Sequence, residues 1–168
     1  MAVAKLTGLA AVAAPDARVL VLGSMPGARS LQQQQYYAHP RNSFWAIMAD
    51  IYQFDRHGPY PIRLTNIRQQ GVALWDVVGR CHRAGSLDSS IDSQSVVAND
   101  FPAFFSAHPH ISALLFNGAK AESLYKKFVI PELPQHLQLV DSMRMPSTSP
   151  AHAAMPYEQK LAHWRAVL

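Results

Sequence analysis

The stretch Arg18 to Gly23 (RVLVLG) decides the fold, because it is a short apolar run that ends at a glycine and leads directly into Ser24 to Gly27 (SMPG). Such a run, bounded by turn residues, is typical of a strand that is buried in a parallel sheet. Comparable runs occupy Val72–Val77, Ile111–Asn117 and Leu137–Ser142, and each ends at a polar loop. The sequence therefore predicts four buried strands.

Helical patterns lie between these runs. Ser43–Tyr52 places apolar residues at steps of three and four, which predicts a helix with one apolar face. Further helices are expected from Asn99 through Phe104, over Gly118–Phe128, and along the terminal stripe of Tyr157, Leu161, Trp164 and Leu168. Strands that alternate with helices favour right-handed βαβ units. We therefore predict an α/β fold of three layers, α/β/α, with a central and mainly parallel four-stranded sheet in a single domain over residues 1–168.

Composition restricts the class of protein. Hydrophobic residues make up 49% of the 168 residues and charged residues only 15%, so the chain can bury a core and is not globally disordered. Fifteen Lys and Arg against eleven Asp and Glu give a net charge of +4, which permits binding to a polyanion. The single cysteine, Cys81, excludes an internal disulfide and four-cysteine metal sites and fits a reducing cytoplasm. The start of the chain is too weakly apolar for a signal peptide, and no run reaches the roughly 20 apolar residues of a membrane span, so no membrane partner is expected.

The loop after the first strand is the first candidate for chemistry. It comprises Gly23, Ser24, Met25, Pro26 and Gly27. Its glycines allow backbone angles that other residues avoid, and exposed amides there can hold an oxyanion or a phosphate. An ordinary turn of glycine and proline explains the same residues equally simply.

A second candidate is Gln35 to Trp45, which is aromatic, polar and stiffened by proline just before a predicted helix. Tyr37 offers a flat ring for stacking on a nucleobase, and Asn42 offers an amide that can orient a water. The alternative is structural, because Asn42 can instead cap the helix and Phe44 and Trp45 can be core residues.

The third candidate is Met145 to His152 (MPSTSPAH), which precedes the last helix. It carries the hydroxyls of Ser147, Thr148 and Ser149 between two prolines. Such a stiff row of donors suits the phosphates of a nucleic acid. Serine and proline are also what an ordinary surface loop contains, so this loop alone does not decide the function.

Together these segments resemble the uracil-DNA glycosylase superfamily over roughly Val19 to Leu168. YYAHPRNSFW and GSMPG look like stretches of its mismatch-specific uracil enzymes, but those carry an asparagine where this chain has Met25. The hypoxanthine-DNA glycosylases also lack that asparagine and are similar at GSMPG, HPRNSFW, GVALWDV, FNG and MPSTSP. In that family the asparagine of HPxNxFW is the important catalytic residue, which corresponds to Asn42. Met145 stands where classical uracil enzymes have a catalytic histidine, so efficient uracil excision is not expected.

The resemblance implies roles for the remaining candidates. Asn42 would orient the attacking water, the Gly23–Gly27 loop would face the flipped base, Tyr37 would stack on it, and His39 would fix the loop. Asp76 stands where the uracil enzymes have their base-reading asparagine. It would accept a hydrogen bond from N1–H of hypoxanthine and thereby reject adenine, or it would instead cap a helix or pair with Arg80. Asn117 would line the pocket or cap the following helix.

The resemblance also implies a partner, DNA that contains a deaminated base, and no metal or organic cofactor. Ser147, Thr148 and Ser149 would contact phosphates, and the tip around His152 would fill the vacated stack. We expect a monofunctional enzyme that acts as a monomer. Two alternatives stay open: a uracil or broad-specificity glycosylase on the same fold, and a nucleic-acid-binding module without enzymatic activity.

Overall fold

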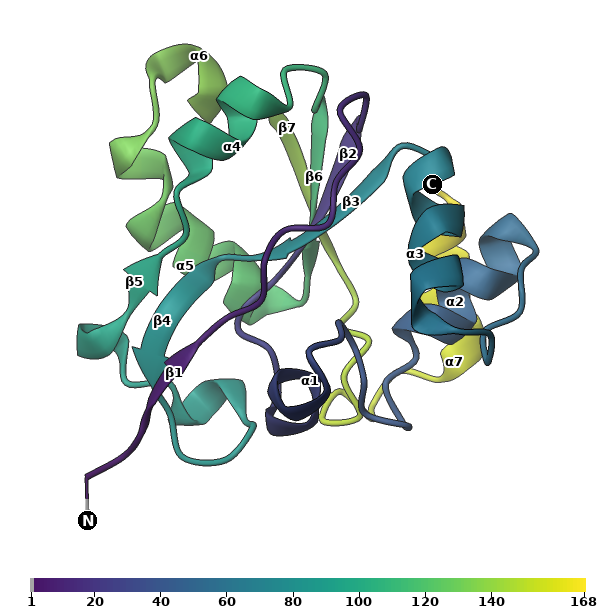
Figure 1. The fold of residues 1–168 in the computed structure, drawn as a ribbon, viewed down its shortest axis with the longest axis horizontal. Coiled ribbons are helices and arrows are strands. Elements are labelled where there is room, and N and C mark those ends of the chain that lie inside the picture. The colour runs from purple at the N-terminus through teal and green to yellow at the C-terminus, as the bar shows by residue number, and fades with distance from the viewer. Residues whose placement is uncertain (1) are drawn as a thin grey trace.

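Four parallel strands form the central sheet in the order β3-β2-β6-β7 (Figure 1) in the computed structural model, which describes residues 2–168. The strands are β2 (Val19–Gly23), β3 (Val72–Asp76), β6 (Ala113–Asn117) and β7 (Asp141–Met145). Gly23 lies opposite Asp76, and Asn117 lies opposite Met145. The carboxyl ends of all four strands therefore meet at one edge, which is where open α/β sheets bind ligands.

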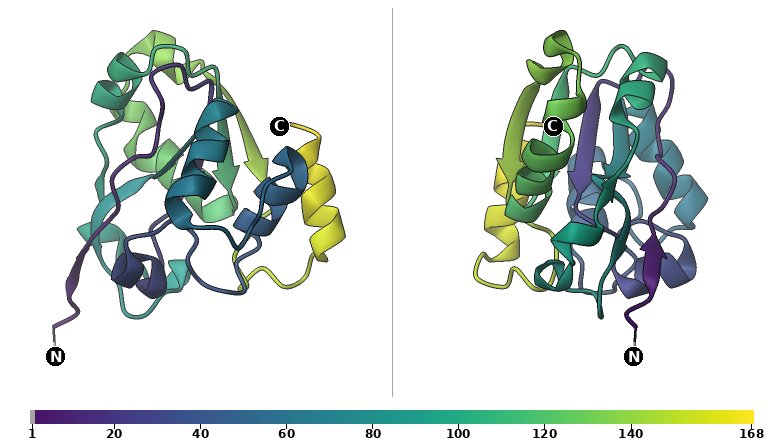
Figure 2. Two further views of the ribbon diagram at one scale, coloured as in Figure 1. Left: turned by 45° about the vertical axis from the view of Figure 1, so that its right-hand side comes forward. Right: turned by 90° about the vertical axis from the view of Figure 1, so that its left-hand side faces the viewer.

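Helices cover both faces of this sheet (Figures 1 and 2). The helices α2 (Phe44–Tyr52), α3 (Tyr60–Gln69) and α7 (Tyr157–Arg165) lie on one face, and α4 (Phe101–Ala107) and α5 (Ala119–Phe128) lie on the other. The alternation of β2 explains the two cores, because Val21 packs in the cluster of α2 and α7 whereas Leu20 and Leu22 pack in the cluster of α4 and α5. The predicted three-layer fold with a parallel four-stranded sheet is confirmed.

Three predicted strands and all four predicted helices agree with the structure to within three residues at their ends, but the bounds of the fourth strand are wrong. Leu137 to Ser142 was expected as a strand, whereas Gln135–Gln138 is the short helix α6 and the strand runs from Asp141 to Met145. Leu137 and Val140 pack against the α4 and α5 core, which explains the apolar pattern. β7 lies at the edge of the sheet and is exposed over its first four residues, so no apolar run marks it.

A second, antiparallel sheet in the order β1-β4-β5 was not predicted. It contains β1 (Lys5–Thr7), β4 (Val78–His82) and β5 (Val97–Ala98). The sequence also did not indicate α1 (Ala28–Gln33) or α3, nor the 3₁₀ turns η1 (Asp88–Ser90), η2 (Ser93–Ser95) and η3 (Ile130–Glu132). β4 begins two residues after the end of β3, so the second sheet is connected to the carboxyl edge of the first.

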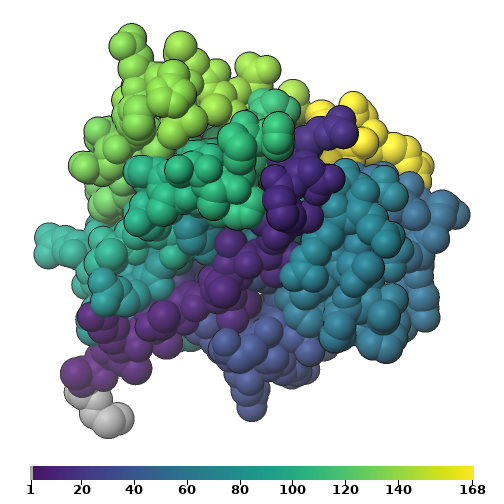
Figure 3. All heavy atoms as spheres, turned by 45° about the horizontal axis from the view of Figure 1, so that its top comes forward, coloured from purple at the N-terminus to yellow at the C-terminus, as the bar shows by residue number. Residues whose placement is uncertain are grey.

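The N-terminal segment covers the outer edge of β3. Val12 and Leu74 exchange two backbone hydrogen bonds of 2.9 and 2.8 Å. In Figure 3 this segment crosses the surface as a purple band between the atoms of α4 and those of α3. Over residues 2–168, no helix is both long enough and apolar enough to cross a bilayer.

Candidate active site

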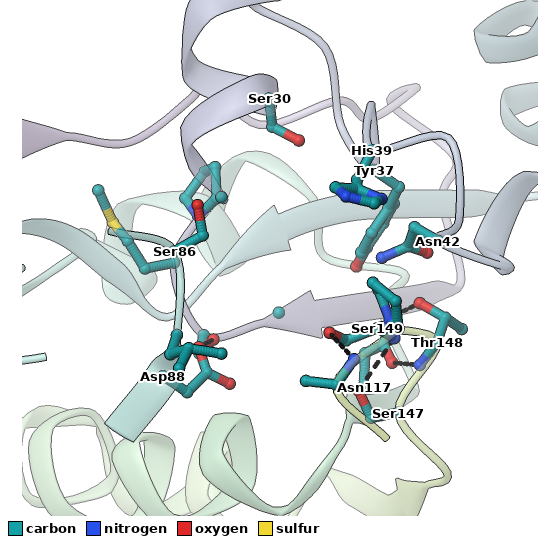
Figure 4. A pocket seen from close by; sticks show the side chains of 18 of the residues that line it. Ser30, Tyr37, His39, Asn42, Ser86, Asp88, Asn117, Ser147, Thr148 and Ser149 are labelled. Atoms are coloured by element: carbon teal, nitrogen blue, oxygen red, sulfur yellow. Dashed lines mark hydrogen bonds between the residues drawn. The ribbon is translucent and has the colours of Figure 1, made fainter. Parts of the chain in front are cut away.

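A pocket of about 640 Å³ lies at the carboxyl edge of the parallel sheet (Figure 4). It gathers every residue that the sequence singled out, although they come from five separate segments. The predicted residues that line it are Gly23, Ser24, Met25, Pro26, Gly27, Tyr37, His39, Asn42, Asp76, Asn117, Ser147, Thr148, Ser149 and His152. The fold therefore brings the three candidate loops to one place.

Asn42 both supports the start of a helix and lines the pocket, which are the two alternatives that the sequence left open. Its Oδ1 accepts a hydrogen bond of 2.9 Å from the backbone N–H of Phe44, which supports the first turn of α2. Its side chain nevertheless lines the pocket and is only partly buried. Because an N–H needs an acceptor, this bond fixes the carboxamide so that Nδ2 points toward the side of the pocket where Tyr37 stands (Figure 4). One lone pair of Oδ1 and both hydrogens of Nδ2 remain for other partners.

Tyr37 is held in a strained conformation against the aromatic core. Its φ of 54° is in the left-handed region that residues with a Cβ seldom adopt. Its ring stacks on Phe44 with a centroid separation of 4.1 Å, so one face is covered and the ring lines the pocket. Burial and the nearby Asp76 raise the pKa of the Tyr37 hydroxyl, which stays protonated. In the turn that follows, His39 Nδ1 accepts a hydrogen bond of 3.1 Å from the N–H of Arg41.

Asp76 ends β3 at the floor of the pocket and is 4% exposed. Burial and the nearby Asp88 raise the pKa of its carboxyl to about 7, against a smaller lowering by Arg83. A Cβ at Gly23 would overlap the Asp76 carboxyl, so the approach of these two residues requires glycine. Among residues 2–168 the ion pairs join Glu122 to its neighbours and do not include Asp76, so the alternative of a pair with Arg80 is wrong.

Two buried orphan atoms lie at this floor. Within the described chain, neither Asp76 Oδ2 nor the Tyr37 hydroxyl has a hydrogen-bond partner. Buried polar atoms in proteins nearly always have a partner, and each exception needs an explanation such as strain, a catalytic role or a bound water. Both atoms therefore keep an unused capacity for hydrogen bonding at the floor of the pocket.

Asn117 holds the last loop in place and does not cap a helix. Its Oδ1 accepts from the N–H of Thr148 and its Nδ2 donates to the Thr148 hydroxyl, both at 2.9 Å. The residue that precedes α5 is Gly118, with a φ of 97°, and a Cβ there would lie 3.0 Å from Cβ of Ser147. Thr148 is only 1% exposed and its hydroxyl accepts from Asn117, so its side chain does not fit the predicted contact with phosphate.

The two serines beside Thr148 remain suited to an anion. Ser147 Oγ accepts from the N–H of Ser149, and Ser149 Oγ accepts from the N–H of Ala151, each at 3.2 Å. Both hydroxyl hydrogens therefore stay available to donate into the pocket. Figure 4 places both serines on the same side of the pocket as Asn117.

The terminal helix α7 fixes the ends of this loop. Trp164 Nε1 donates to the carbonyl of Pro146 at 3.1 Å, and Lys160 Nζ donates to the carbonyl of His152 at 2.8 Å. Lys160 is 5% exposed, and burial lowers the pKa of its ammonium group. The exposed side chain of His152 is thereby presented at the rim of the pocket.

The sequence did not indicate the segment 86–89, which lines the opposite side of the pocket. Ser24 Oγ donates to Asp88 Oδ1 at 2.5 Å, so this segment is attached to the Gly23–Gly27 loop. The buried Arg83 holds the same loop by donating to the carbonyls of Pro26 at 2.7 Å and Met25 at 3.5 Å. Gly85, Ser86 and Asp88 follow a strand and are residue types that favour turns. This turn signal was the local clue to the segment.

Positive charge at the exposed rim of the pocket comes from two arginines. Arg29 and Arg41 line it and are exposed. Arg144 donates at 2.8 Å to Glu122 and is partly neutralised by it. Among residues 2–168, His, Cys, Asp and Glu side chains do not gather in a group of three that could hold a metal ion.

Comparison with known proteins identifies the family. A family model described as the uracil DNA glycosylase superfamily matches residues 10–168. Relatives named hypoxanthine DNA glycosylase occur in Methanosarcina barkeri (33% identity over 70% of this chain and 73% of the relative) and Methanosarcina acetivorans (34%, over 68% and 72%). A solution NMR structure of a candidate uracil DNA glycosylase from Methanosarcina acetivorans superposes with a TM-score of 0.80 at 29% identity, covering 98% of this chain and 96% of that one. The pocket at the carboxyl edge, its loops and these matches agree: the chain belongs to the uracil-DNA glycosylase superfamily.

Proposed function

We propose that this protein hydrolyses the N-glycosidic bond of deoxyinosine in DNA, releasing hypoxanthine and leaving an abasic site. The observation that carries the proposal is the floor of the pocket, where a buried acceptor, Asp76, and a stacking ring, Tyr37, lie beside a fixed carboxamide, Asn42. The names of the Methanosarcina relatives support hypoxanthine as the base.

Asp76 supplies the selection of the base. An ionised carboxylate only accepts hydrogen bonds, so it pairs with N1–H of hypoxanthine, whereas adenine presents a lone pair at N1 and is repelled. The orphan Oδ2 of Asp76 gains its missing partner when such an N–H enters. Uracil and xanthine also carry a ring N–H of this kind, so the same observation favours deaminated bases as a class.

Stacking and phosphate contacts hold the extruded nucleotide. Tyr37 is covered by Phe44 on one face and offers the other to the base, a contact worth about 1 to 3 kcal/mol. Ser147 and Ser149 donate their hydroxyl hydrogens to the flanking phosphates, and Arg29 and Arg41 add positive charge.

Asn42 carries the hydrolysis. The bond between C1′ and the base breaks with its electron pair on the base, and water adds its oxygen at C1′ and gives a proton to solvent, while the base gains one. The second lone pair of Asn42 Oδ1 orients the water, and Nδ2 donates toward the substrate from the pocket wall. An amide is too weak a base to take the proton early, so the rate gain comes from positioning and electrostatics.

The test is alkaline cleavage of a duplex that contains one deoxyinosine, after incubation with the wild-type protein, with Asn42→Ala and with Asn42→Asp. Asn42→Asp keeps the acceptor for the Phe44 N–H, so it controls for loss of the helix cap, while it removes the amide donor. Asn42→Ala is expected to lose almost all excision and to stay folded. Binding of the duplex without any cleavage by the wild-type protein would instead support the non-enzymatic alternative, and a matching panel with uracil and xanthine decides the breadth of the substrate class.

A further inference from the structure

The buried guanidinium of Arg83 lies behind the loop that lines one side of the pocket. Arg83 is 3% exposed and is not among the described residues that line the pocket, whereas Met25, Pro26 and Gly27 do line it. Its partners are backbone carbonyls, those of Met25 and Pro26 on the loop and that of Gly85 on its own segment. Within residues 2–168 no carboxylate lies within ion-pair distance of Arg83, so its positive charge is unpaired. The proposed function does not use this charge.

The hydrogen bonds of Arg83 also set the direction of a loop amide. Arg83 Nη2 donates to the carbonyl of Pro26 at 2.7 Å, which turns that carbonyl away from the pocket. In a trans peptide the carbonyl and the following N–H point in opposite directions, so the N–H of Gly27 points away from Arg83. Within residues 2–168 this N–H has no acceptor. It is therefore free to donate to a molecule in the pocket that Gly27 lines.

The floor of the pocket carries negative charge, which opposes the departure of a base. Hydrolysis leaves the electron pair of the glycosidic bond on the base, and Asp76 and Asp88 line the space where this charge develops. Burial and Asp88 raise the pKa of Asp76 and Arg83 lowers it, so the field of the guanidinium acts at the floor. Donors and charges that are fixed in advance stabilise developing charge far better in such a site than they do in water.

We propose that Arg83 is a positioning residue for the departing base, because it turns the Gly27 N–H toward the pocket and places a positive charge behind that N–H. This inference rests on the proposed function. The bond between C1′ and N9 of hypoxanthine breaks with its electron pair on the base. The Gly27 N–H and the guanidinium stabilise this charge until the base takes a proton from solvent. Arg83 keeps all its protons throughout, and the attacking water still gives its proton to solvent.

The first experiment measures single-turnover excision from a duplex with one deoxyinosine and from the same duplex with 2-fluorodeoxyinosine. Fluorine replaces the hydrogen at C2 and makes the base a better leaving group. The proteins are the wild type, Arg83→Lys, which keeps the charge, and Arg83→Gln, which keeps an N–H donor without the charge. Arg80→Gln is the matched control, because Arg80 is an exposed arginine on the same strand and outside the pocket. A thermal melt of each variant checks that it is folded.

The second experiment tests the amide itself and does not alter Arg83. Gly27→Pro removes the N–H, and the φ of −67° at this position suits proline. Gly27→Ala keeps the N–H and is the reference, since a Cβ there would lie at an ordinary contact distance of 3.7 Å from Ser86. Excision by Gly27→Pro is expected to be roughly 100-fold slower than excision by Gly27→Ala, as for the loss of one oxyanion-hole donor.

Arg83→Gln is expected to lose roughly 100-fold in the excision of hypoxanthine and several-fold less with 2-fluorohypoxanthine, because the better leaving group needs less help. Arg83→Lys should stay within about tenfold of the wild type, and Arg80→Gln should match it. Equal losses in Arg83→Lys and Arg83→Gln, or an Arg83→Gln loss that is the same for both bases, overturn the proposal. Equal rates for Gly27→Pro and Gly27→Ala also overturn it, and this pair decides alone if Arg83→Gln does not fold. If the wild-type protein excises neither base, it is the proposed function that fails.

Discussion

Substitution of Asp76 by Asn removes one titrating carboxyl from the floor of the pocket and changes little else in shape. In the folded chain its pKa is about 7, against an ordinary value of 3.8, because burial and Asp88 disfavour its ionised form. A difference of one in pKa corresponds to about 1.4 kcal/mol, so full ionisation costs the folded state about 4 kcal/mol. Because the pKa of Asp76 is higher in the folded chain than in the unfolded chain, raising the pH disfavours the folded state. The folded state is free of this cost below about pH 4, and the cost grows to its full value as the pH rises to about 7.

Chemical denaturation across that range measures the effect. We subtract the free energy of unfolding of Asp76→Asn from that of the wild-type protein. This difference should fall by about 1.4 kcal/mol for each pH unit between about pH 4 and about pH 7, and it should stay level above about pH 7. Titrating groups that do not interact with Asp76 are shared and cancel in the difference. A difference that does not change with pH would refute the reasoning, because it would mean that the carboxyl is not desolvated in the folded chain.

Excision gives an independent readout of the same group. Above its pKa Asp76 is a pure acceptor that suits hypoxanthine and rejects adenine, whereas its protonated form also has a donor that can meet the N1 of adenine. Burial and Asp88 raise the pKa of Asp76 and Arg83 lowers it, so these influences set the balance between the two forms. The ratio of hypoxanthine to adenine excision should therefore rise from about pH 6 to about pH 8 in the wild-type protein and stay flat in Asp76→Asn.

Further substitutions test other parts of the site. Gly118→Ala should destabilise the fold by about 2 kcal/mol, because it combines a positive φ with a close approach to Ser147, and a thermal melt checks it. Lys160→Met should leave the sheet intact but weaken binding to an abasic duplex several-fold, measured by fluorescence anisotropy, because the carbonyl of His152 loses its donor; equal affinity would mean that the tip keeps its position without it. Arg41→Ala should reduce the slope of log affinity against log salt by about one, and an unchanged slope would place Arg41 away from phosphate.

The sequence predicted the site more completely than the boundaries of the fold. Asp76 ends a strand of the parallel sheet and the loop of Ser147 follows another, and the carboxyl ends of such strands meet at one edge. Asn42 lies after α1, and it was assigned to the same site by the family resemblance. What the patterns lacked was tertiary information. The buried state of Thr148 depends on Asn117, 31 residues away, and no local pattern reports such a pair.

The segment 86–89 escaped prediction for a related reason. Its place is set by the pairing of β4 with β1 and β5, which are short, and by the buried Arg83. An arginine in a sequence is normally expected at the surface, so the burial of Arg83 was not predicted. β1 and β5 have only three and two residues, which is too few for an alternating pattern of apolar and polar residues to be recognised. The misplaced fourth strand shows the converse, since the apolar side chains of Leu137 and Val140 serve packing outside the sheet.

The Ser147 to His152 loop lacks regular secondary structure, yet four of its amides donate within the protein: those of Thr148, Ser149, Ala151 and His152. Its carbonyl at Thr148 is in turn bonded to the amide of Ser43, at the start of α2. Amide hydrogen exchange in this loop should therefore be slow, closer to that of the sheet than to that of a chain end. A loop that its own hydrogen bonds already hold in one conformation loses little conformational entropy on binding. Under the proposed contacts of Ser147 and Ser149, most of the energy of each phosphate contact is therefore available to hold the DNA.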